Sequence, residues 1–428
     1  MTDQRLEAVR IVARFLKDRA WVAPLISKNA HKFKDARDFK LLTELVYGSI
    51  KNLTKIEAIA NSFLKKSNLK EFDDFQRAII IVSIYELLFL KRIPKYATVN
   101  TYVELAKISN RSKFPPLLNG ILRNISRSEM LPAFPVYQEY SFSERLFKYL
   151  SSQLEENFLK KFLEYTLTVH PTYIRIEDFI TEPRHAAEFE AEEYGLKGTI
   201  FPETFKIIDG ESFHNSHITY RVTFQDFSTQ IAQHLIPYVP RGTYLDLASA
   251  PFMKATFLAR KYRDTIIVAN DINIKKIRKA RKELYDGSTR NILFVNSDGV
   301  SSAFREIFDV VILDAPCSGL GTIRRKPELK YYMTPERITE LTTLQLELLE
   351  TAAQCLKPMG YLVYMTCTIN PSENEHQILR FLERHGDFII EKLMQIEGTS
   401  LIQKREGVYV DGAENDCDYF FLSLLKRS

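Results

Sequence analysis

Residues 308–330 read FDVVILDAPCSGLGTIRRKPELK, and the apolar run near the start of this stretch decides the fold. A strand as continuously apolar as Val310–Leu313 is typical of a parallel sheet that is covered by helices on both faces. The run ends at Asp314, and an Ala-Pro step then leads to Cys317 and a glycine-containing loop. We therefore expect a buried strand that delivers Asp314 and Cys317 to one edge of an α/β sheet.

The same alternation of strands and helices extends over residues 216–428. The apolar runs predict strands at Thr243–Leu247, Thr265–Asn270, Asn291–Val295, Phe308–Leu313 and Gly360–Met365. Amphipathic stretches between them predict helices at Lys254–Arg260, Ile272–Leu284 and Pro335–Cys355. This is the pattern of a doubly wound, Rossmann-like α/β domain, whose ligands bind outside the carboxyl ends of the strands.

Acidic residues stand at the ends of successive predicted strands, namely Asp246, Asp271, Asp298 and Asp314. A single such carboxylate could simply cap the helix that follows it. A set that ends consecutive strands instead favours a bound ligand, because the acid after the second strand of a nucleotide-binding sheet accepts hydrogen bonds from ribose.

Two further regions precede this domain. Residues 1–130 show helical periodicity, with breaks at Pro94 and at Pro115-Pro116, and they predict a helical bundle. Residues 131–215 predict a linker and a small mixed domain, with helices at Phe142–Leu150 and Leu154–Tyr165 and one strand at Tyr173–Ile176.

Charge is divided unevenly between these regions. Residues 1–130 hold 24 Lys and Arg against 13 Asp and Glu, whereas the remaining residues hold 35 against 41. The basic first region could bind a polyanion such as RNA, or it could be a Lys-rich helical surface in contact with solvent only. Apolar content of 45% and charged content of 26% are typical of a soluble protein. We expect a cytoplasmic monomer that does not contact a membrane, because no apolar stretch is long enough to cross one.

The four cysteines form no CxxC pair and stand at no zinc-ligand spacing from a histidine, so we expect no metal site. Cys317 lies in the quoted stretch close to Arg324-Arg325-Lys326, a setting in which a lowered thiol pKa is expected. Residues 361–375 read YLVYMTCTINPSENE, in which a second strand ends at a cysteine, Cys367. Cys317 and Cys367 should therefore share one sheet edge, whereas Cys355 and Cys417 are better explained as small core residues.

DAPCSGLGTIRRKPELK and YMTCTINPSENE resemble the two cysteine motifs of the RNA 5-methylcytosine methyltransferases. The similarity is strongest to the bacterial branch of that family that acts on 16S ribosomal RNA and carries an N-terminal domain similar to the antitermination factor NusB. FKLLTELVYGSI, IYELLFLKRIP and LLNGILRNI, all within residues 1–130, resemble segments of that N-terminal domain.

The resemblance implies an S-adenosyl-L-methionine-dependent methylation of carbon 5 of a cytosine in small-subunit ribosomal RNA. Cys367 would be the nucleophile that adds to carbon 6, and Cys317 would assist its release. Asp314 would contact the methionine end of the cofactor or the cytosine edge. Asp271 would hold the ribose, and Asp298 would lie near the adenine. Because the base must leave its stack, we expect single-stranded or loop RNA as the substrate.

The loop after the first strand departs from the family pattern. The family reads approximately Cys-Ala-Ala-Pro-Gly-Gly-Lys-Thr there, and this chain has Ala248, Ser249, Ala250, Pro251, Phe252, Met253, Lys254 and Ala255. We expect residues 248–254 to contact the cofactor, with Lys254 also catalytic. Phe252 and Met253 replace glycines that permit close approach of a ligand, so they could weaken cofactor binding.

Two other positions depart from the family pattern, and two alternative functions are consistent with the sequence. Glu177 stands where the family usually has Asn, and Tyr419 where it usually has Gly. One alternative is a catalytically impaired RNA-binding or ribosome-assembly factor that retains the fold, and the other is a cytosine methyltransferase that acts on transfer RNA.

Overall fold

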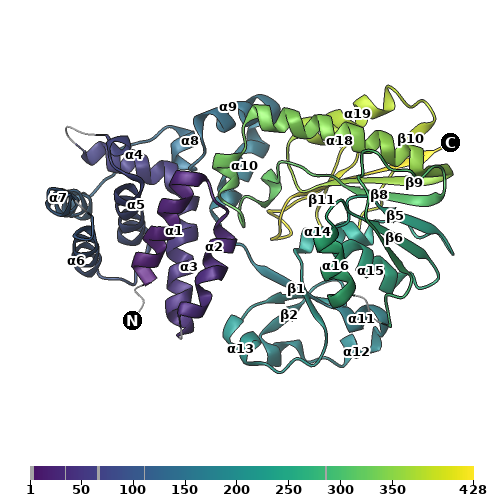
Figure 1. Cartoon of the computed structure of the whole chain (residues 1–428), viewed down its shortest axis with the longest axis horizontal. Coiled ribbons are helices and arrows are strands. Elements are labelled where there is room, and N and C mark those ends of the chain that lie inside the picture. The colour runs from purple at the N-terminus through teal and green to yellow at the C-terminus, as the bar shows by residue number, and fades with distance from the viewer. Residues whose placement is uncertain (1–3, 34, 65–67, 110, 285–286) are drawn as a thin grey trace. The chain divides into compact units, whose positions relative to one another are not determined.

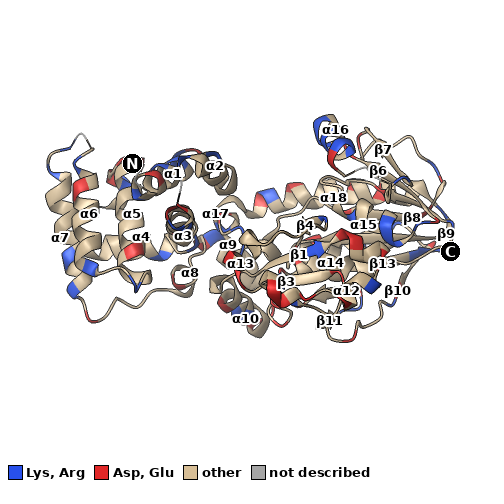
Figure 2. Cartoon of the chain, turned by 90° about the horizontal axis from the view of Figure 1, so that it is seen from below, with Lys and Arg blue, Asp and Glu red and all other residues tan. Residues whose placement is uncertain are grey.

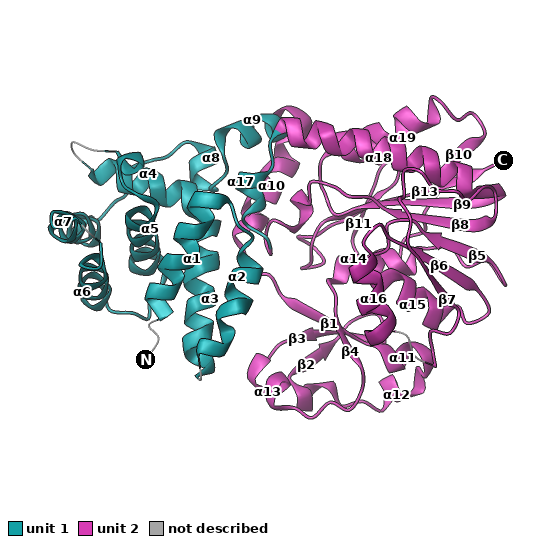
Figure 3. Ribbon diagram, in the orientation of Figure 1, with its two compact units in different colours: residues 1–151, 326–334 teal, residues 152–325, 335–428 magenta. Residues whose placement is uncertain are grey.

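A computed structural model of the chain describes residues 4–33, 35–64, 68–109, 111–284 and 287–428 (Figure 1). It consists of two compact units, coloured separately in Figure 3. Unit 1 comprises residues 1–151 and 326–334, and unit 2 comprises residues 152–325 and 335–428. None of the helices in the described ranges combines the length and the apolarity that a bilayer crossing requires.

Unit 1 is helical, as the sequence predicts. Its helices are α1 (Gln4–Asp18), α2 (Val22–Asn29), α3 (Ala36–Lys51), α4 (Leu53–Phe63), α5 (Asp74–Phe89), α6 (Lys95–Ala106), α7 (Phe114–Arg127), α8 (Val136–Glu139) and α17 (Leu329–Tyr332), with 3-10 turns at Ala30–Lys32 and Leu69–Glu71. Helix α5 is central and buried on nearly all sides, and Asp73 caps its first turn by accepting a hydrogen bond from the Gln76 amide. Its buried carboxylate, Glu86, is ion-paired to Arg5 of α1 at 2.8 Å, which fixes these two helices together.

Residues 326–334 reach unit 1 directly from the glycine-containing loop that follows Cys317. Tyr332 is part of the helical core, and the Tyr331 hydroxyl donates to the Ile50 and Ser141 carbonyls at 3.0 Å each. The ammonium group of Lys330 is buried and donates to the Tyr140 carbonyl at 2.8 Å. The segment is thus an integral part of the helical unit although it is distant in sequence.

Helix α9 (Glu144–Gln153) lies mostly in unit 1 and leads the chain into unit 2, which starts at Ser152 and continues with α10 (Glu156–Leu167). A small antiparallel sheet follows, in the order β2-β3-β1-β4, with strands β1 (Thr172–Ile176), β2 (Leu196–Gly198), β3 (Thr204–Ile207) and β4 (Val222–Phe224). Short helices connect these strands: α11 (Glu177–Thr181), α12 (Arg184–Ala187), a 3-10 turn (Ala191–Tyr194) and α13 (Gly210–Asn215). The sequence predicts β1 but not its three short partners.

The large sheet of unit 2 contains nine strands among the described residues. Its main order is β11-β12-β13-β9-β8-β5-β6-β7, and β10 also pairs with β13. The strands are β5 (Thr243–Asp246), β6 (Ile266–Asn270), β7 (Ile292–Val295), β8 (Phe308–Asp314), β9 (Leu356–Thr366), β10 (Phe388–Glu391), β11 (Leu401–Gln403), β12 (Val408–Val410) and β13 (Phe420–Arg427). The five strands that the sequence predicts, β5 to β9, form the parallel part of the sheet. The antiparallel strands β10 to β13 were not predicted.

Helices cover both faces of this sheet, as expected for a doubly wound fold. One face packs on α14 (Phe227–His234), α15 (Met253–Lys261) and α16 (Ile274–Glu283), and the other on α18 (Pro335–Cys355) and α19 (Glu375–Leu382). Successive strand residues alternate between the two cores: Val310 belongs to the first and Val311 to the second. This double burial explains why the strands are continuously apolar.

Candidate active site

The register of the parallel strands brings the chemically interesting residues to one sheet edge. Asp314, the last residue of β8, lies opposite Met365 of β9, and Asp246, the last residue of β5, lies opposite Ile312 of β8. Cys317 follows Asp314 by three positions, and Cys367 follows Met365 by two. Both cysteines therefore leave the sheet at the same edge, as the sequence predicts.

The two thiols are in contact. The Sγ atoms of Cys317 and Cys367 are 3.4 Å apart, and the Cys367 amide donates to the Cys317 sulfur at 3.3 Å. Both cysteines are free and only partly buried, whereas Cys355 and Cys417 are completely buried, as the sequence predicts. The edge of the sheet thus presents two reduced sulfurs side by side.

The expectation of a lowered pKa for the Cys317 thiol is wrong. Its hydrogen bond to Cys367, together with burial, raises its pKa well above the ordinary value. The expected cations are engaged elsewhere, because Arg324 pairs with Asp416 at 2.9 Å and Arg325 pairs with Asp418 at 2.6 Å. Cys317 is accordingly protonated at neutral pH.

Lys254 and Asp314 form an ion pair beside the cysteines. Lys254 belongs to the first turn of α15, and its ammonium lies 6.0 Å from the ring centroid of Phe420. Burial alone would lower the pKa of Lys254, but the Asp314 carboxylate raises it overall, so Lys254 is charged at neutral pH. The structure therefore brings together the four residues that the sequence singles out for catalysis.

The unusual loop 248–253 turns its aromatic residue into the core. Phe252 adopts a left-handed conformation with φ of 72°, and only 1% of the residue is exposed. Its ring packs edge-on against Phe294 of β7, with centroids 5.4 Å apart. The backbone thus keeps the conformation that glycine favours, and the bulky ring lies within the core formed with α15 and α16.

Asp246 has unused hydrogen-bonding capacity at the start of this loop. Its Oδ2 accepts a hydrogen bond from the Ser249 hydroxyl at 2.6 Å, whereas its buried Oδ1 has no partner among the described residues. Burial raises the pKa of this carboxyl to about 6. A buried carboxylate oxygen without a partner is well suited to accept a hydrogen bond from a ligand or to pair with a ligand's cationic group. The sequence places Asp246 at a strand end, but it does not reveal this unsatisfied oxygen.

The other two predicted acids lie further along the sheet edge. Asp271 follows β6, and its carboxylate accepts hydrogen bonds from the Ala250 amide at 3.0 Å and the Asn273 amide at 2.8 Å. Asp271 thus adjoins the loop 248–253. Asp298 follows β7, is exposed, and accepts a hydrogen bond from the Val300 amide at 3.0 Å.

Glu373 joins the two cysteine loops, and no sequence motif predicts this role for it. Its carboxylate is buried and accepts hydrogen bonds from the Ser318 amide at 2.7 Å and the Ser318 hydroxyl at 2.5 Å. Three further side chains donate to it, from Thr368 at 3.3 Å, Asn370 at 3.1 Å and Gln345 at 3.1 Å. Glu373 lies in the acidic segment SENE after Cys367, which was the available sequence signal. Only the fold shows that the Glu373 carboxylate reaches Ser318, the residue next to Cys317.

Glycine at position 321 allows these loops to approach closely. The Gly321 amide donates to the Cys367 carbonyl at 3.0 Å, and a Cβ atom at this position would lie 2.3 Å from the Tyr419 carbonyl oxygen. Any side chain would therefore push the Cys317 loop away from Cys367.

The two smaller departures from the family pattern are both buried. Glu177 pairs with Arg175 at 2.8 Å and with Arg260 of α15 at 2.9 Å, so it joins the small sheet to the large domain. Tyr419 fills a hollow beside α10, where its ring meets that of Tyr165 edge-on at 5.0 Å. Glu177 thus serves an internal contact in this chain.

Two family descriptions match the sequence. The 16S rRNA methyltransferase RsmB/F family matches residues 234–426, and the NusB family matches residues 2–127. A probable ribosomal RNA small subunit methyltransferase B from Synechocystis sp. is 30% identical over 369 residues, which covers 82% of each chain. A probable protein of the same name from Bacillus subtilis is 29% identical over 407 residues, which covers 90% of each chain.

Solved structures support the same architecture. The crystal structure of PH0851 matches with a TM-score of 0.78 at 23% identity and covers 100% of this chain and 99% of that one. NSun6 from Pyrococcus horikoshii, whose crystal structure contains SFG, matches with a TM-score of 0.56 at 16% identity, covering 67% and 99% of the respective chains. At these identities the likeness concerns the fold.

Proposed function

This chain belongs to the ribosomal RNA small subunit methyltransferase B family, and from that premise we propose that it methylates carbon 5 of a cytosine in small-subunit ribosomal RNA. The observation that carries the proposal is the 3.4 Å contact between the sulfurs of Cys317 and Cys367 at the catalytic edge of a methyltransferase sheet. Carbon 5 of cytosine is a poor nucleophile, and thiol addition to carbon 6 is a way to activate it.

The residues around loop 248–253 fit S-adenosyl-L-methionine. The unpartnered Oδ1 of Asp246 is a buried acceptor for an ammonium group, and the Asp271 carboxylate lies beside the same loop. Phe252 is packed into the core, which supports cofactor binding, because one of the two side chains expected to obstruct the loop is turned inward. When bound, the cofactor supplies a methyl group on a sulfonium. We assign Asp246, Asp271, Asp298, Asp314 and the backbone of residues 248–254 to holding it.

Cys367 is the proposed nucleophile. We assign the hydrogen of the contact between the two sulfurs to Cys317, whose pKa is raised, and a hydrogen bond to the charged form favours the Cys367 thiolate. That thiolate forms a bond to carbon 6, and the proton of Cys317 passes to the pyrimidine ring. Carbon 5 thereby gains enamine character and can accept the methyl group.

Release requires a base, and we assign this role to Cys317. Having given up its proton, the Cys317 thiolate takes the proton from carbon 5. The electron pair of that C–H bond restores the double bond between carbons 5 and 6, and the bond between carbon 6 and Cys367 breaks. Both cysteines return to their starting states, and the proton gained by the ring leaves to solvent. Asp314, held by Lys254, is placed to orient the cytosine edge or the cofactor.

Unit 1 is the proposed dock for the RNA. Residues 1–130 carry 24 cationic against 13 acidic side chains, and this excess attracts a phosphate backbone. The target base must leave its stack to reach the cysteines, so we propose a single-stranded or loop segment of the ribosomal RNA as the substrate.

Methyl transfer to isolated RNA tests the proposal. Unmethylated small-subunit ribosomal RNA is incubated with the full chain and labelled S-adenosyl-L-methionine, and the digested nucleosides are separated. We expect label in 5-methylcytidine with the wild type and with the matched control Cys355→Ala, and none with Cys367→Ala. Label in another nucleoside, or label that survives the Cys367 substitution, would refute the proposal.

A further inference from the structure

Helix α16 exposes a dense set of cations on unit 2. It contains six basic residues and one acid, all exposed, namely Lys275, Lys276, Arg278, Lys279, Arg281, Lys282 and Glu283. Only Ile277 and Ala280 are buried, and they attach the helix to the sheet. Figure 2 shows α16 as a largely blue helix beside β6 and β7.

This charge pattern works against the helix itself. Like charges occupy neighbouring turns, as in the i,i+4 pairs Lys275–Lys279 and Arg278–Lys282, and such pairs are destabilising. Lys275 and Lys276 also stand in the first turn, where the helix dipole disfavours cations. Within the described part of the helix, the ion pair that offsets this repulsion is Lys279–Glu283, at 3.8 Å. An external anion would relieve this repulsion.

Helix α16 is strongly basic, whereas the rest of residues 131–428 has an excess of acidic side chains. Outside this helix, residues 131–428 hold 29 Lys and Arg against 40 Asp and Glu. The helix begins three residues after Asp271, at the catalytic edge of the sheet, and runs away from it. Near its far end lies a polar recess of about 360 Å³ lined by Arg263, Gly287, Ser288, Arg290 and Asn291. The basic surface therefore extends along α16, from the catalytic edge to the recess near its far end.

We propose that α16 and the Arg263–Arg290 recess bind the sugar-phosphate backbone of the substrate RNA next to the target cytosine. The proposal rests on the function proposed above and adds a second RNA-binding surface, on the catalytic unit. A polyanion with closely spaced phosphates matches a helix of about 15 Å whose exposed side chains are nearly all cationic. The contact is sequence-independent and positions the RNA, while the catalytic edge selects the base.

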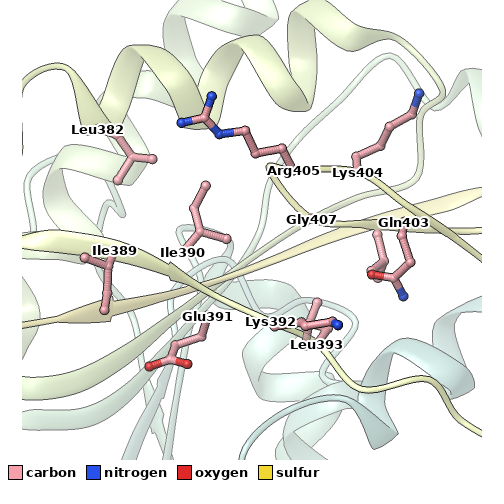
Figure 4. Close-up of a pocket in the computed structure, with 11 residues that line it drawn as sticks. Leu382, Ile389, Ile390, Glu391, Lys392, Leu393, Gln403, Lys404, Arg405 and Gly407 are labelled. Carbon is pink, nitrogen blue, oxygen red and sulfur yellow. The ribbon is translucent and has the colours of Figure 1, made fainter.

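A triple substitution with a matched control tests this surface. Lys275→Gln, Arg278→Gln and Lys282→Gln together remove three exposed cations from one side of α16. The control, Arg380→Gln, Lys392→Gln and Arg405→Gln, removes three exposed cations elsewhere on unit 2. Lys392 and Arg405 line a recess of about 650 Å³ and are labelled in Figure 4. Affinity for a fluorescent small-subunit ribosomal RNA fragment is measured by anisotropy between 50 and 200 mM salt, conditions over which phosphate contacts weaken by orders of magnitude (~10³ for six contacts).

We expect the α16 variant to bind the fragment at least tenfold more weakly at low salt. The slope of log affinity against log salt should fall by about 2, since each lost contact to single-stranded RNA contributes about 0.7. Cofactor affinity should match the wild type, and in methylation the loss should fall on KM for RNA while kcat is retained.

If the α16 variant has unchanged RNA affinity and an unchanged salt slope, or if the control variant loses as much RNA affinity, the proposal that α16 binds the RNA backbone is wrong. The proposed function fails differently: wild-type chain that binds the fragment but never methylates cytosine refutes the reaction. In that case, a loss of RNA binding confined to the α16 variant still supports RNA binding by α16.

Discussion

At the scale of single residues, the chemistry depends on two buried carboxylates. Glu373 is held by donors from both cysteine loops, whereas Asp246 retains an oxygen without a described partner. The sequence identifies both cysteines, Lys254 and Asp314, because these lie in recognisable motifs. It could not reveal Glu373 or the raised pKa of Cys317, since both depend on contacts between segments about 50 residues apart.

Replacing Glu373 by Gln should loosen the contact between the two cysteine loops. The amide presents donors to Ser318 and Asn370, and leaving such buried donors unmatched costs about 1–3 kcal/mol per group. We expect kcat to fall by about 10- to 100-fold, a loss of about 1.4–2.7 kcal/mol in transition-state stabilisation, with cofactor affinity nearly unchanged. The rate at which a mild oxidant joins Cys317 to Cys367 should fall in parallel.

The matched control for this substitution is Glu375→Gln, whose carboxylate accepts a hydrogen bond from Tyr409 at 2.7 Å outside the two cysteine loops. If Glu373→Gln and Glu375→Gln have the same kcat and the same oxidation rate, Glu373 does not position the cysteines.

Replacing Asp246 by Asn should stabilise the protein without cofactor and abolish cofactor binding. The pKa of Asp246 is raised to about 6, above its ordinary value of 3.8, so the folded state resists its ionisation. The free-energy cost of ionising Asp246 in the folded state is absent below about pH 4 and complete above about pH 6, where it amounts to about 3 kcal/mol. Thermal unfolding at pH 5 and pH 7.5 should show a higher Tm for the variant, with the larger gain at pH 7.5. A variant that still binds S-adenosyl-L-methionine as tightly as the wild type would contradict this role for Asp246.

At the scale of elements, the parallel strands and their helices could be predicted, whereas all antiparallel strands except β1 could not. Strands β5 to β9 are apolar runs followed by helices, so their periodicity is clear from the sequence. Strands β2, β3, β4, β11 and β12 have three or four residues each, too few to establish an alternation. The sequence also marked loop 248–253 as unusual, but the direction of the Phe252 ring follows from its packing against Phe294.

Phe252→Gly, which restores the family residue, should therefore cost stability and leave cofactor binding nearly unchanged. Loss of a buried phenyl ring destabilises by about 3–5 kcal/mol, and relief of the left-handed conformation returns about 1–2 kcal/mol. We expect the free energy of unfolding in urea to fall by about 2–3 kcal/mol. A rise of more than tenfold in cofactor affinity, measured by calorimetric titration, would show that the ring obstructs the site after all.

At the scale of the whole molecule, the sequence predicted a basic helical region and a catalytic α/β region. The predicted boundaries of 1–130, 131–215 and 216–428 stay a proposal. The sequence could not show that residues 326–334 belong to the helical unit, because their aromatic side chains resemble those of any core segment. Within unit 2, contacts between distant segments converge on His170, which pairs with Asp226 at 3.0 Å and with Asp418 at 3.3 Å.

This histidine should make the stability of the protein depend on pH. Burial alone lowers the pKa of His170, but its hydrogen bond to Asp226 and its ion pair with Asp418 raise that pKa above 6.5 overall. Burial raises the pKa of the Asp226 carboxyl, but His170, Arg325 and Ser228 together lower it to about 2. The stabilisation from His170 is therefore complete below pH 6.5 and is lost as pH rises through the folded-state pKa. In urea unfolding, His170→Gln should remove this decline; an unchanged pH profile would contradict the assignment.

The division of labour between Cys367 and Cys317 is the central claim, and trapping the covalent intermediate tests it most directly. Cys317→Ala chain is incubated with unmethylated small-subunit ribosomal RNA and S-adenosyl-L-methionine, then run on a denaturing gel. We predict a protein–RNA adduct that accumulates because its release lacks a base, and that disappears when Cys367→Ala is added to the variant. Clean turnover by Cys317→Ala, or an adduct that persists without the Cys367 thiol, would contradict the account.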